Sequence, residues 1–201
     1  HYHLFDGQWF EIEKDYLTKL KNELDRIFIQ NTRLIACEHK DEEDYNKNAA
    51  KVSNLICLDR ANISLCGRDK IEPCDLLYIE GDKVNLVHIK VSTRSSALSH
   101  LFRQGVNSLE VLRLEQESKN KLKELLKNHS EIIEKIEQNQ YSLTYGIITA
   151  KNANMKSSAL PIFSRISLMA ALRQCWLLGV ECSVVLIEDK FDRSKSKSKK
   201  K

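Results

Sequence analysis

Two short stretches of the sequence carry residue types that could do hydrolytic chemistry. Asp75 opens one apolar run, and the next apolar run contains His88-Ile89-Lys90. Because side chains alternate along a strand, His88 and Lys90 are expected on one face, about 6–7 Å apart. Asp75 is expected beside them on the paired strand, so that all three open into one pocket. A carboxylate, an imidazole and an ammonium placed together can bind a metal ion or a phosphate.

Each of these residues also has a structural interpretation. Asp75 could cap the end of a strand, and His88 could be a half-buried histidine with a satisfied hydrogen bond. Lys90 is harder to explain in this way, because a lysine on a central strand rarely stays buried without an anionic partner. We therefore expect Lys90 to face Asp75 or a bound phosphate.

Polar groups on the following helix are expected at the same edge. These are Ser96, Ser99, His100, Arg103 and Gln104. The serines and His100 could instead be helix caps and packing groups, and Arg103 is interpreted as a solvated surface charge. Asp59-Arg60, earlier in the chain, either contributes to the site or forms a plain ion pair.

The spacing of apolar residues predicts the elements that position these groups. The expected order is α-β-β-β-α-(α)-β-α-β, preceded by a small hairpin in FDGQWFEI. Helices are expected around 15–27, 42–54, 95–112, 116–138 and 167–178, and strands around 55–58 with 63–66, then 76–79, 84–91, 141–149 and 180–187. A three-strand meander followed by helix–strand crossovers predicts an α/β (mixed α+β) fold. Its central mixed sheet would have helices on both faces.

Composition places the chain among ordinary globular proteins. It has 201 residues, of which 42% are hydrophobic and 30% charged, with a formal net charge of +4. Residues 190–201 hold seven Lys or Arg and one Asp, so the rest of the chain is mildly acidic. We expect one domain over 1–189, with a hairpin and helix in 1–36 and the core in 42–189. Residues 190–201 are expected to form a disordered basic tail.

Several classes of protein are excluded by missing patterns. The six cysteines form no CxxC pair, which argues against a zinc site. There is no GxGxxG, Walker A or GxSxG motif. No apolar run reaches the roughly 18 residues of a membrane span, and the first ten residues lack the features of a signal peptide. We therefore expect a cytoplasmic protein with no membrane partner.

The predicted order of elements and residues resembles the PD-(D/E)XK, or restriction-endonuclease-like, nuclease superfamily. Its core has the order α-β-β-β-α-β, with an acid at the start of the second strand and acid-x-Lys on the third. The resemblance implies that Pro73-Cys74-Asp75 and His88-Ile89-Lys90 are the two halves of a catalytic site. In that superfamily the acids hold a divalent ion that stabilises charge on the scissile phosphate. The lysine positions or activates the attacking water.

The chain departs from this pattern at one position, because His88 stands where the superfamily has its second acid. An imidazole adds no negative charge and prefers softer ions than magnesium. Replacement carboxylates are Glu72, Asp59, and one of Glu42 or Glu43. The implied metal ligands are therefore Asp75, His88, Glu72 and Asp59, with Mg²⁺ or Mn²⁺ as the cofactor. Gln104 is similar to the glutamine on the helix after the lysine strand in RecB-like nucleases.

A second resemblance covers about 180 residues. The motifs that carry it include Asp6-Gly7 with Trp9-Phe10, Leu58-Asp59-Arg60, His88-Ile89-Lys90, Leu98-Ser99-His100-Leu101-Phe102 and Leu160-Pro161-Ile162-Phe163-Ser164. In this order they resemble a sporadically distributed bacterial family of unknown function found near phage-defence and mobile-element genes. His-x-Lys is the usual form in that family.

Together these observations predict a nuclease-like domain in defence against phage or mobile DNA. Asp75, His88 and Lys90 are its expected catalytic residues, and Arg60, Ser96, Ser99, His100 and Gln104 are expected to contact nucleic acid, with DNA favoured as the partner. The alternative is a catalytically inactive nuclease fold that serves as a nucleic-acid-binding or protein-assembly module. Further partners could be a second copy of the chain or other proteins of a defence system.

Overall fold

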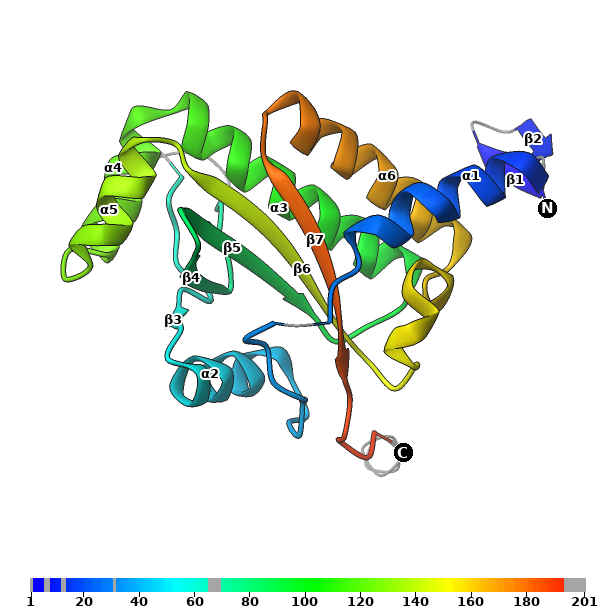
Figure 1. The fold of residues 1–201 in the computed structure, drawn as a ribbon, viewed down its shortest axis with the longest axis horizontal. Helices are drawn as coiled ribbons and strands as arrows, with labels where there is room; N and C mark the ends of the chain where they lie inside the picture. Colours follow the sequence, from blue (N-terminus) through cyan, green and yellow to red (C-terminus); the bar gives the residue numbers. More distant parts are fainter. Residues whose placement is uncertain (1, 6–7, 12–13, 31, 65–69, 194–201) are drawn as a thin grey trace.

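A computed structural model describes residues 2–5, 8–11, 14–30, 32–64 and 70–193 (Figure 1). A hairpin comes first, and a single five-stranded sheet with its helices follows. The strands are β1 (Tyr2–Phe5), β2 (Gln8–Glu11), β3 (Ile56–Cys57), β4 (Leu76–Glu80), β5 (Lys83–Lys90), β6 (Tyr141–Thr149) and β7 (Glu181–Glu188). The helices are α1 (Lys14–Leu24), α2 (Glu42–Ser53), α3 (Ser95–Leu114), α4 (Gln116–Leu125), α5 (Ser130–Glu137) and α6 (Ile162–Leu177), with short 3-10 helices η1 (Asp25–Ile27) and η2 (Ala153–Ala159).

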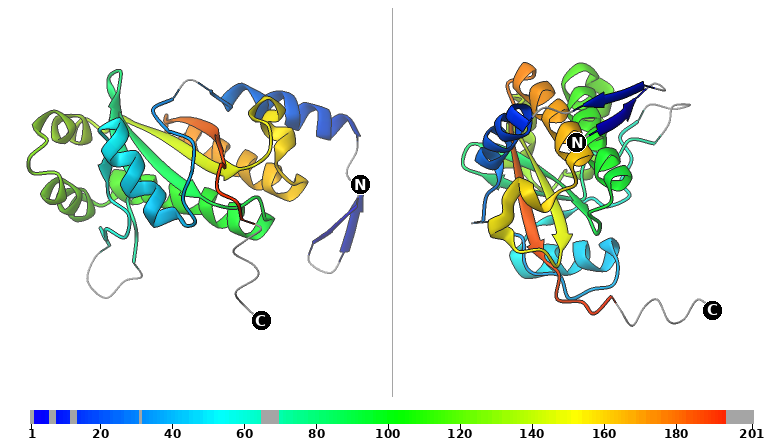
Figure 2. Two further views of the ribbon diagram at one scale, coloured as in Figure 1. Left: turned by 90° about the horizontal axis from the view of Figure 1, so that it is seen from below. Right: turned by 90° about the vertical axis from the view of Figure 1, so that its right-hand side faces the viewer.

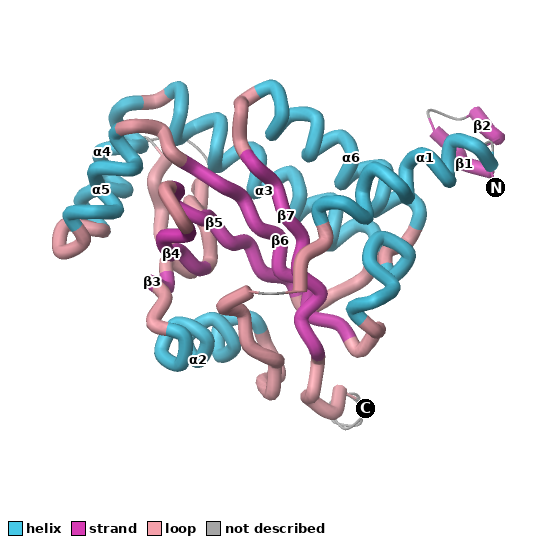
Figure 3. Tube along the Cα trace, viewed as in Figure 1, coloured by secondary structure: helices cyan, strands magenta, loops and turns pink. Residues whose placement is uncertain are grey.

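The central sheet is mixed. Its strands lie side by side in the order β3-β4-β5-β6-β7 (Figure 3). The β3/β4 and β4/β5 pairs are antiparallel, and the β5/β6 and β6/β7 pairs are parallel. The three-strand meander is therefore confirmed, and the parallel strands are joined by helical crossovers, as such pairs require. Residues 63–64, which were expected to be in a strand, form none, and residues 65–66 lie outside the described part.

Helices cover both faces of the sheet, as predicted. One face packs against α1, α3 and α6 in the larger apolar core. The other face packs against α2 and the chain around Cys37 in a smaller core that includes Tyr45, Val87 and Ile89. The helix expected over 116–138 is two helices, α4 and α5, at one end of the molecule, whereas the β1–β2 hairpin lies at the other end (Figure 2). None of the helices in the described ranges is both long and apolar enough to cross a membrane.

The N-terminal hairpin is present, with Tyr2 opposite Glu11 and Phe5 opposite Gln8. Its predicted turn, Asp6-Gly7, lies outside the described residues. At the other end of the chain, the first residues of the expected tail are attached to the body of the protein. The Lys190 amide donates to Cys37 O, and Arg193 forms an ion pair with Asp189 and donates to Lys40 O. The ordered body therefore continues to residue 193, and residues 194–201 lie outside the described part.

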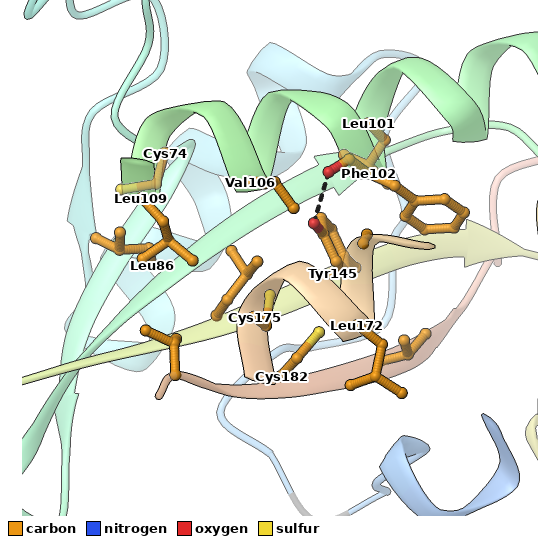
Figure 4. Close-up of a cluster of buried hydrophobic side chains, with 14 of the residues drawn as sticks. Cys74, Leu86, Leu101, Phe102, Val106, Leu109, Tyr145, Leu172, Cys175 and Cys182 are labelled. Atoms are coloured by element: carbon orange, nitrogen blue, oxygen red, sulfur yellow. Dashed lines mark hydrogen bonds between the residues drawn. The ribbon is translucent and has the colours of Figure 1, made fainter. Parts of the chain in front are cut away.

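The packing of α3 on β6 depends on a glycine. Tyr145 on β6 donates its hydroxyl to Phe102 O at 2.7 Å, and its ring lies against the face of α3 at Gly105 (Figure 4). A Cβ atom at Gly105 would come within 2.7 Å of Tyr145 Cε1 and 2.8 Å of its hydroxyl oxygen. The ring is fully buried, and its hydroxyl is held by the hydrogen bond to α3.

We expect Gly105→Ala to lower the free energy of unfolding by about 1–2 kcal/mol. Because the added Cβ would come so close to the ring, overpacking here should cost about 2–3 kcal/mol, and the higher helix propensity of alanine returns about 1 kcal/mol of this. Chemical denaturation measures the difference, with Asn107→Ala on the exposed side of the same helix as the control. Equal midpoints for Gly105→Ala and the wild type would show that the helix and strand are packed less closely.

Candidate active site

Antiparallel pairing brings one end of each of three strands together, at an edge of the sheet that is formed by strand ends. β3 ends just before Asp59, β4 begins just after Asp75, and β5 ends at Lys90. In an antiparallel meander the end of one strand lies beside the start of the next. The backbone hydrogen bonds show this directly, since the Leu58 amide donates to Asp75 O and the Asp75 amide donates to Val87 O, both at 2.9 Å.

Three carboxylates meet at this edge. Asp59, Glu72 and Asp75 each place one oxygen within 4.8 Å of the others. Asp75 is only 9% exposed, and its Oδ2 accepts the Ile89 amide at 2.5 Å. That hydrogen bond fixes the carboxylate against the end of β5. Asp59 and Glu72 are half-buried and close the group on the solvent side.

The electrostatic environment of Asp75 disfavours its charged form. The pKa of this carboxyl group is raised to about 7, mainly by burial and in smaller part by the nearby acids Asp59, Glu72 and Glu42. The hydrogen bond from the Ile89 amide acts in the opposite direction. A cation between these oxygens would relieve both the burial cost and the mutual repulsion.

Lys90 faces a fourth carboxylate, which belongs to α2. Its Nζ donates to Glu42 Oε2 at 2.8 Å, and the Val91 amide donates to Glu42 Oε1 at 2.9 Å. Glu42 is the first residue of α2, and the side chain of Asp41 caps that helix through the Asp44 amide. The start of α2 is thereby attached to the end of β5. The lysine's partner is thus Glu42 rather than Asp75.

These groups line a cavity of about 420 Å³, which we call the active-site cavity. The helix α3 forms one wall with a polar stripe at helical spacing. The lining side chains are Glu42, Asp59, Lys70, Ile71, Glu72, Asp75, Ile89 and Lys90, with His100, Arg103, Gln104 and Asn107 from α3. Two of them hold Glu72, since Lys70 forms an ion pair with it at 2.8 Å and Gln104 Nε2 donates to it at 3.4 Å.

His88 does not line this cavity, so the expected convergence of His88 with Asp75 and Lys90 is corrected. His88 is fully buried under α3, where its Nε2 lies 3.2 Å from Ser108 Oγ. Ser108 donates its own hydrogen to Gly105 O, so His88 Nε2 is the donor in the pair. Among the described residues no group reaches His88 Nδ1.

The spacing of helix and strand explains this difference between His88 and Lys90. Four residues of a helix rise about 6 Å, and two residues of a strand rise about 6.6 Å. Because α3 runs back along β5, Ser108 covers His88, and Gln104, one turn earlier, lies at the level of the strand end where Lys90 emerges. Strand alternation predicts the shared face but not where the covering helix begins.

We expect His88→Leu to leave divalent-metal affinity unchanged and to reduce acid sensitivity. Burial lowers the pKa of His88 to about 3, so the folded protein binds fewer protons there than the unfolded chain. The wild type therefore keeps its stability above about pH 6.5 and loses about 2–3 kcal/mol from this group by pH 4.5. Denaturation at both pH values measures the loss for each protein. A fall in metal affinity in the variant would instead make His88 a ligand.

The other predicted nucleic-acid contacts are divided among neighbouring positions. His100 and Gln104 line the active-site cavity. Arg60 is exposed, forms an ion pair with Glu43 at 2.6 Å and lies in an adjoining cavity. Ser99 Oγ is 2.9 Å from Ser167 Oγ, between α3 and α6. Ser96 is exposed in the first turn of α3 and lines none of these cavities.

Sequence reasoning missed two polar lining residues, Lys70 and Asn107, and left Glu42 unresolved. Glu42 was one of two alternatives, and nothing in the run of acids at 41–44 indicates which side chain turns toward β5. Arg103 was placed near the site but interpreted as a surface charge; it is exposed and lines the cavity. A usable signal existed for α3, because His100, Arg103, Gln104 and Asn107 repeat at three- and four-residue spacing opposite its apolar stripe.

The donor set suits a hard divalent cation. Mg²⁺ and Mn²⁺ prefer carboxylate oxygens, which Asp59, Glu72 and Asp75 offer. The three carboxylates repel one another, and a bound cation would offset that repulsion. This acidic triad could therefore hold a metal. His88, the fourth expected ligand, is outside the group.

Comparison with known proteins gives one match. A protein-family model described as a family of unknown function (DUF6119) matches residues 1–188. No curated protein and no solved structure matches the chain. Because the match spans nearly the whole sequence, the chain belongs to this family of unknown function, DUF6119.

Proposed function

We propose that this chain is a nuclease-like domain that binds nucleic acid and hydrolyses its phosphodiester bonds with a divalent metal. One observation carries the proposal. Three carboxylates that could hold a cation share a cavity with a lysine that is held by a fourth carboxylate. Such a set suits hydrolysis of a phosphodiester, because a bound ion stabilises charge on the phosphate and the lysine can donate to a water molecule or a phosphate oxygen.

Each side chain has a separate part in this proposal. Asp59, Glu72 and Asp75 would hold the ion, and Gln104 and Lys70 orient Glu72. Bound there, a divalent ion would stabilise negative charge on the scissile phosphate. Lys90 offers N–H donors to a water molecule or a phosphate oxygen. Glu42 limits the motion of the lysine, because it accepts from both Lys90 and the Val91 amide.

One observation favours the alternative, an inactive nuclease fold that only binds nucleic acid or assembles with protein. The position where the related superfamily has its second acid is His88, which is buried against Ser108. The same observation is compatible with catalysis, because Asp59, Glu72 and Glu42 supply carboxylates to the cavity from other segments. We therefore place the active enzyme first.

The biological setting is also part of the proposal. Defence against phage or mobile DNA, in the cytoplasm and with DNA as the substrate, is supported by the sequence resemblance. The site itself supports only the chemistry, since its cations and carboxylates do not distinguish DNA from RNA.

The direct test is a cleavage assay on single- and double-stranded DNA and RNA with Mg²⁺ or Mn²⁺. The wild type should cleave at least one substrate, and chelation by EDTA should stop the reaction. The control is a preparation of Asp75→Asn purified in parallel, which detects contaminating nuclease. Activity that is equal in the two preparations, or that persists in EDTA, would contradict the proposal. Metal-independent binding without cleavage would support the inactive module.

A further inference from the structure

The active-site cavity is the middle member of a row of three. On one side it shares Glu42, Asp59 and Glu72 with a cavity of about 660 Å³, here called the α2-side cavity. On the other side it shares Arg103 with a cavity of about 240 Å³ between α3 and α6, here called the α6-side cavity. The carboxylates therefore lie in a cavity that adjoins two others at different lining residues, and those two share no lining residue with each other.

Cationic and hydrogen-bonding groups lie on both sides of the carboxylates. The cations that line the α2-side cavity are Lys40, Arg60 and Arg193, and they lie beside the carboxylates of Asp41, Glu42, Glu43, Asp59 and Glu72. Lys40 and Arg60 are exposed, and Arg60 is held in place by Glu43. Polyanion backbones are bound mainly by such side chains, whose charges neutralise phosphates.

The α6-side cavity is lined by one cationic side chain and several hydrogen-bonding side chains. Arg103 is exposed and forms no ion pair with any described residue, so its guanidinium is available to a phosphate. Beside it, Ser99 and Ser167 place their hydroxyls 2.9 Å apart, and Gln174 completes the polar lining. Hydroxyl and amide groups commonly contact the phosphates and sugars of nucleic acids.

We infer that the substrate is a nucleic-acid strand that continues on both sides of the carboxylates, so that internal phosphodiester bonds are cleaved. The inference rests on the proposed function and specifies its substrate. An enzyme that removes terminal nucleotides must stop the strand on one side of the reacting phosphate. In the described part of the chain, cavities adjoin the carboxylate-lined cavity toward α2 and toward α6, and each of them is lined by at least one cationic side chain.

Covalently closed circles test this inference. The substrate class that the cleavage assay identifies is prepared as a closed circle and as the same sequence opened once. The circle should be cleaved at a rate similar to that of the linear form, and the first products should be internal fragments. A circle that resists cleavage while the linear form is shortened from its ends would overturn the inference and leave the proposed hydrolase intact. Cleavage of neither form would overturn the proposed function itself.

Binding measurements test the two sides separately. In a Lys90→Ala background, which prevents cleavage, Arg103→Ala and Lys40→Ala should each weaken strand binding by about tenfold, as expected for a lost charge-assisted contact. Lys127→Ala is the matched control, because Lys127 is exposed in the connection between α4 and α5, away from all three cavities. Fluorescence anisotropy gives each Kd. If only one of the two substitutions weakens binding, the strand extends on one side of the carboxylates only, which contradicts the inference.

Discussion

Asp75→Asn should reduce cleavage by about a thousandfold or more and, at the same time, stabilise the metal-free protein at pH 8. The first effect follows because an amide cannot supply the negative charge that holds a divalent ion or stabilises the reaction. The second effect follows from the cost of ionising this buried carboxyl group beside other acids. An asparagine oxygen can still accept the hydrogen bond from the Ile89 amide.

The direction of the pH dependence can be derived from the raised pKa of Asp75. The folded protein holds the proton up to about pH 7, whereas the unfolded chain loses it near 3.8. The contribution of this group to stability is therefore present at low pH and is lost as pH rises through 7. The shift corresponds to at most about 4 kcal/mol. Asp75→Asn should lose this pH dependence.

Thermal or urea denaturation at pH 5 and pH 8, with EDTA present, measures the effect. Asp82→Asn is the matched control, because Asp82 is an exposed aspartate in the turn at the opposite end of the same hairpin. It should change neither activity nor the pH dependence. A variant at Asp75 that is inactive but also less stable than the wild type at pH 8 would mean that the carboxylate is a structural group.

Lys90→Ala should abolish cleavage, again by about a thousandfold, and cost little stability. The side chains of Lys90 and Glu42 are each 32% exposed in their ion pair. An ion pair this accessible to water contributes at most about 1 kcal/mol. A loss of about 3–5 kcal/mol, as for a buried pair, would show that the lysine has a structural role.

The same strand provides a close control for Lys90. Lys83 begins β5, is 30% exposed and forms an ion pair with Glu181 at 2.8 Å, the same length as the Lys90–Glu42 pair. Lys83→Ala should have a similar small effect on the free energy of unfolding and none on cleavage. Loss of activity in both variants would mean that removing either ion pair disturbs the strand, and would remove the support for a specific role of Lys90.

The sequence was sufficient to predict the sheet and the edge at which the site forms. Short apolar runs separated by Glu80-Gly81-Asp82 predict the β4–β5 hairpin, and a meander necessarily brings Asp59, Asp75 and Lys90 to one edge. These relations depend only on strand direction and alternation. They were therefore accessible without knowledge of how the helices pack.

The remaining parts of the site depend on packing between distant segments. The burial of His88 depends on which residues of α3 lie over β5. The partner of Lys90 depends on the path of the chain before α2. The break between α4 and α5 is similar, because the apolar spacing continues through 116–138 although the helix does not. Periodicity within one element does not specify these arrangements.

Binding of Mn²⁺ tests the central claim most directly, because it does not require the right nucleic acid to be chosen. Isothermal titration calorimetry at pH 6.5 should show binding to the wild type and to Asp82→Asn, with proton release as Asp75 gives up the proton it holds below about pH 7. Asp75→Asn and Glu72→Gln should each lose that binding. Absence of binding to the wild type, or equal binding in the triad variants and the wild type, would contradict the account.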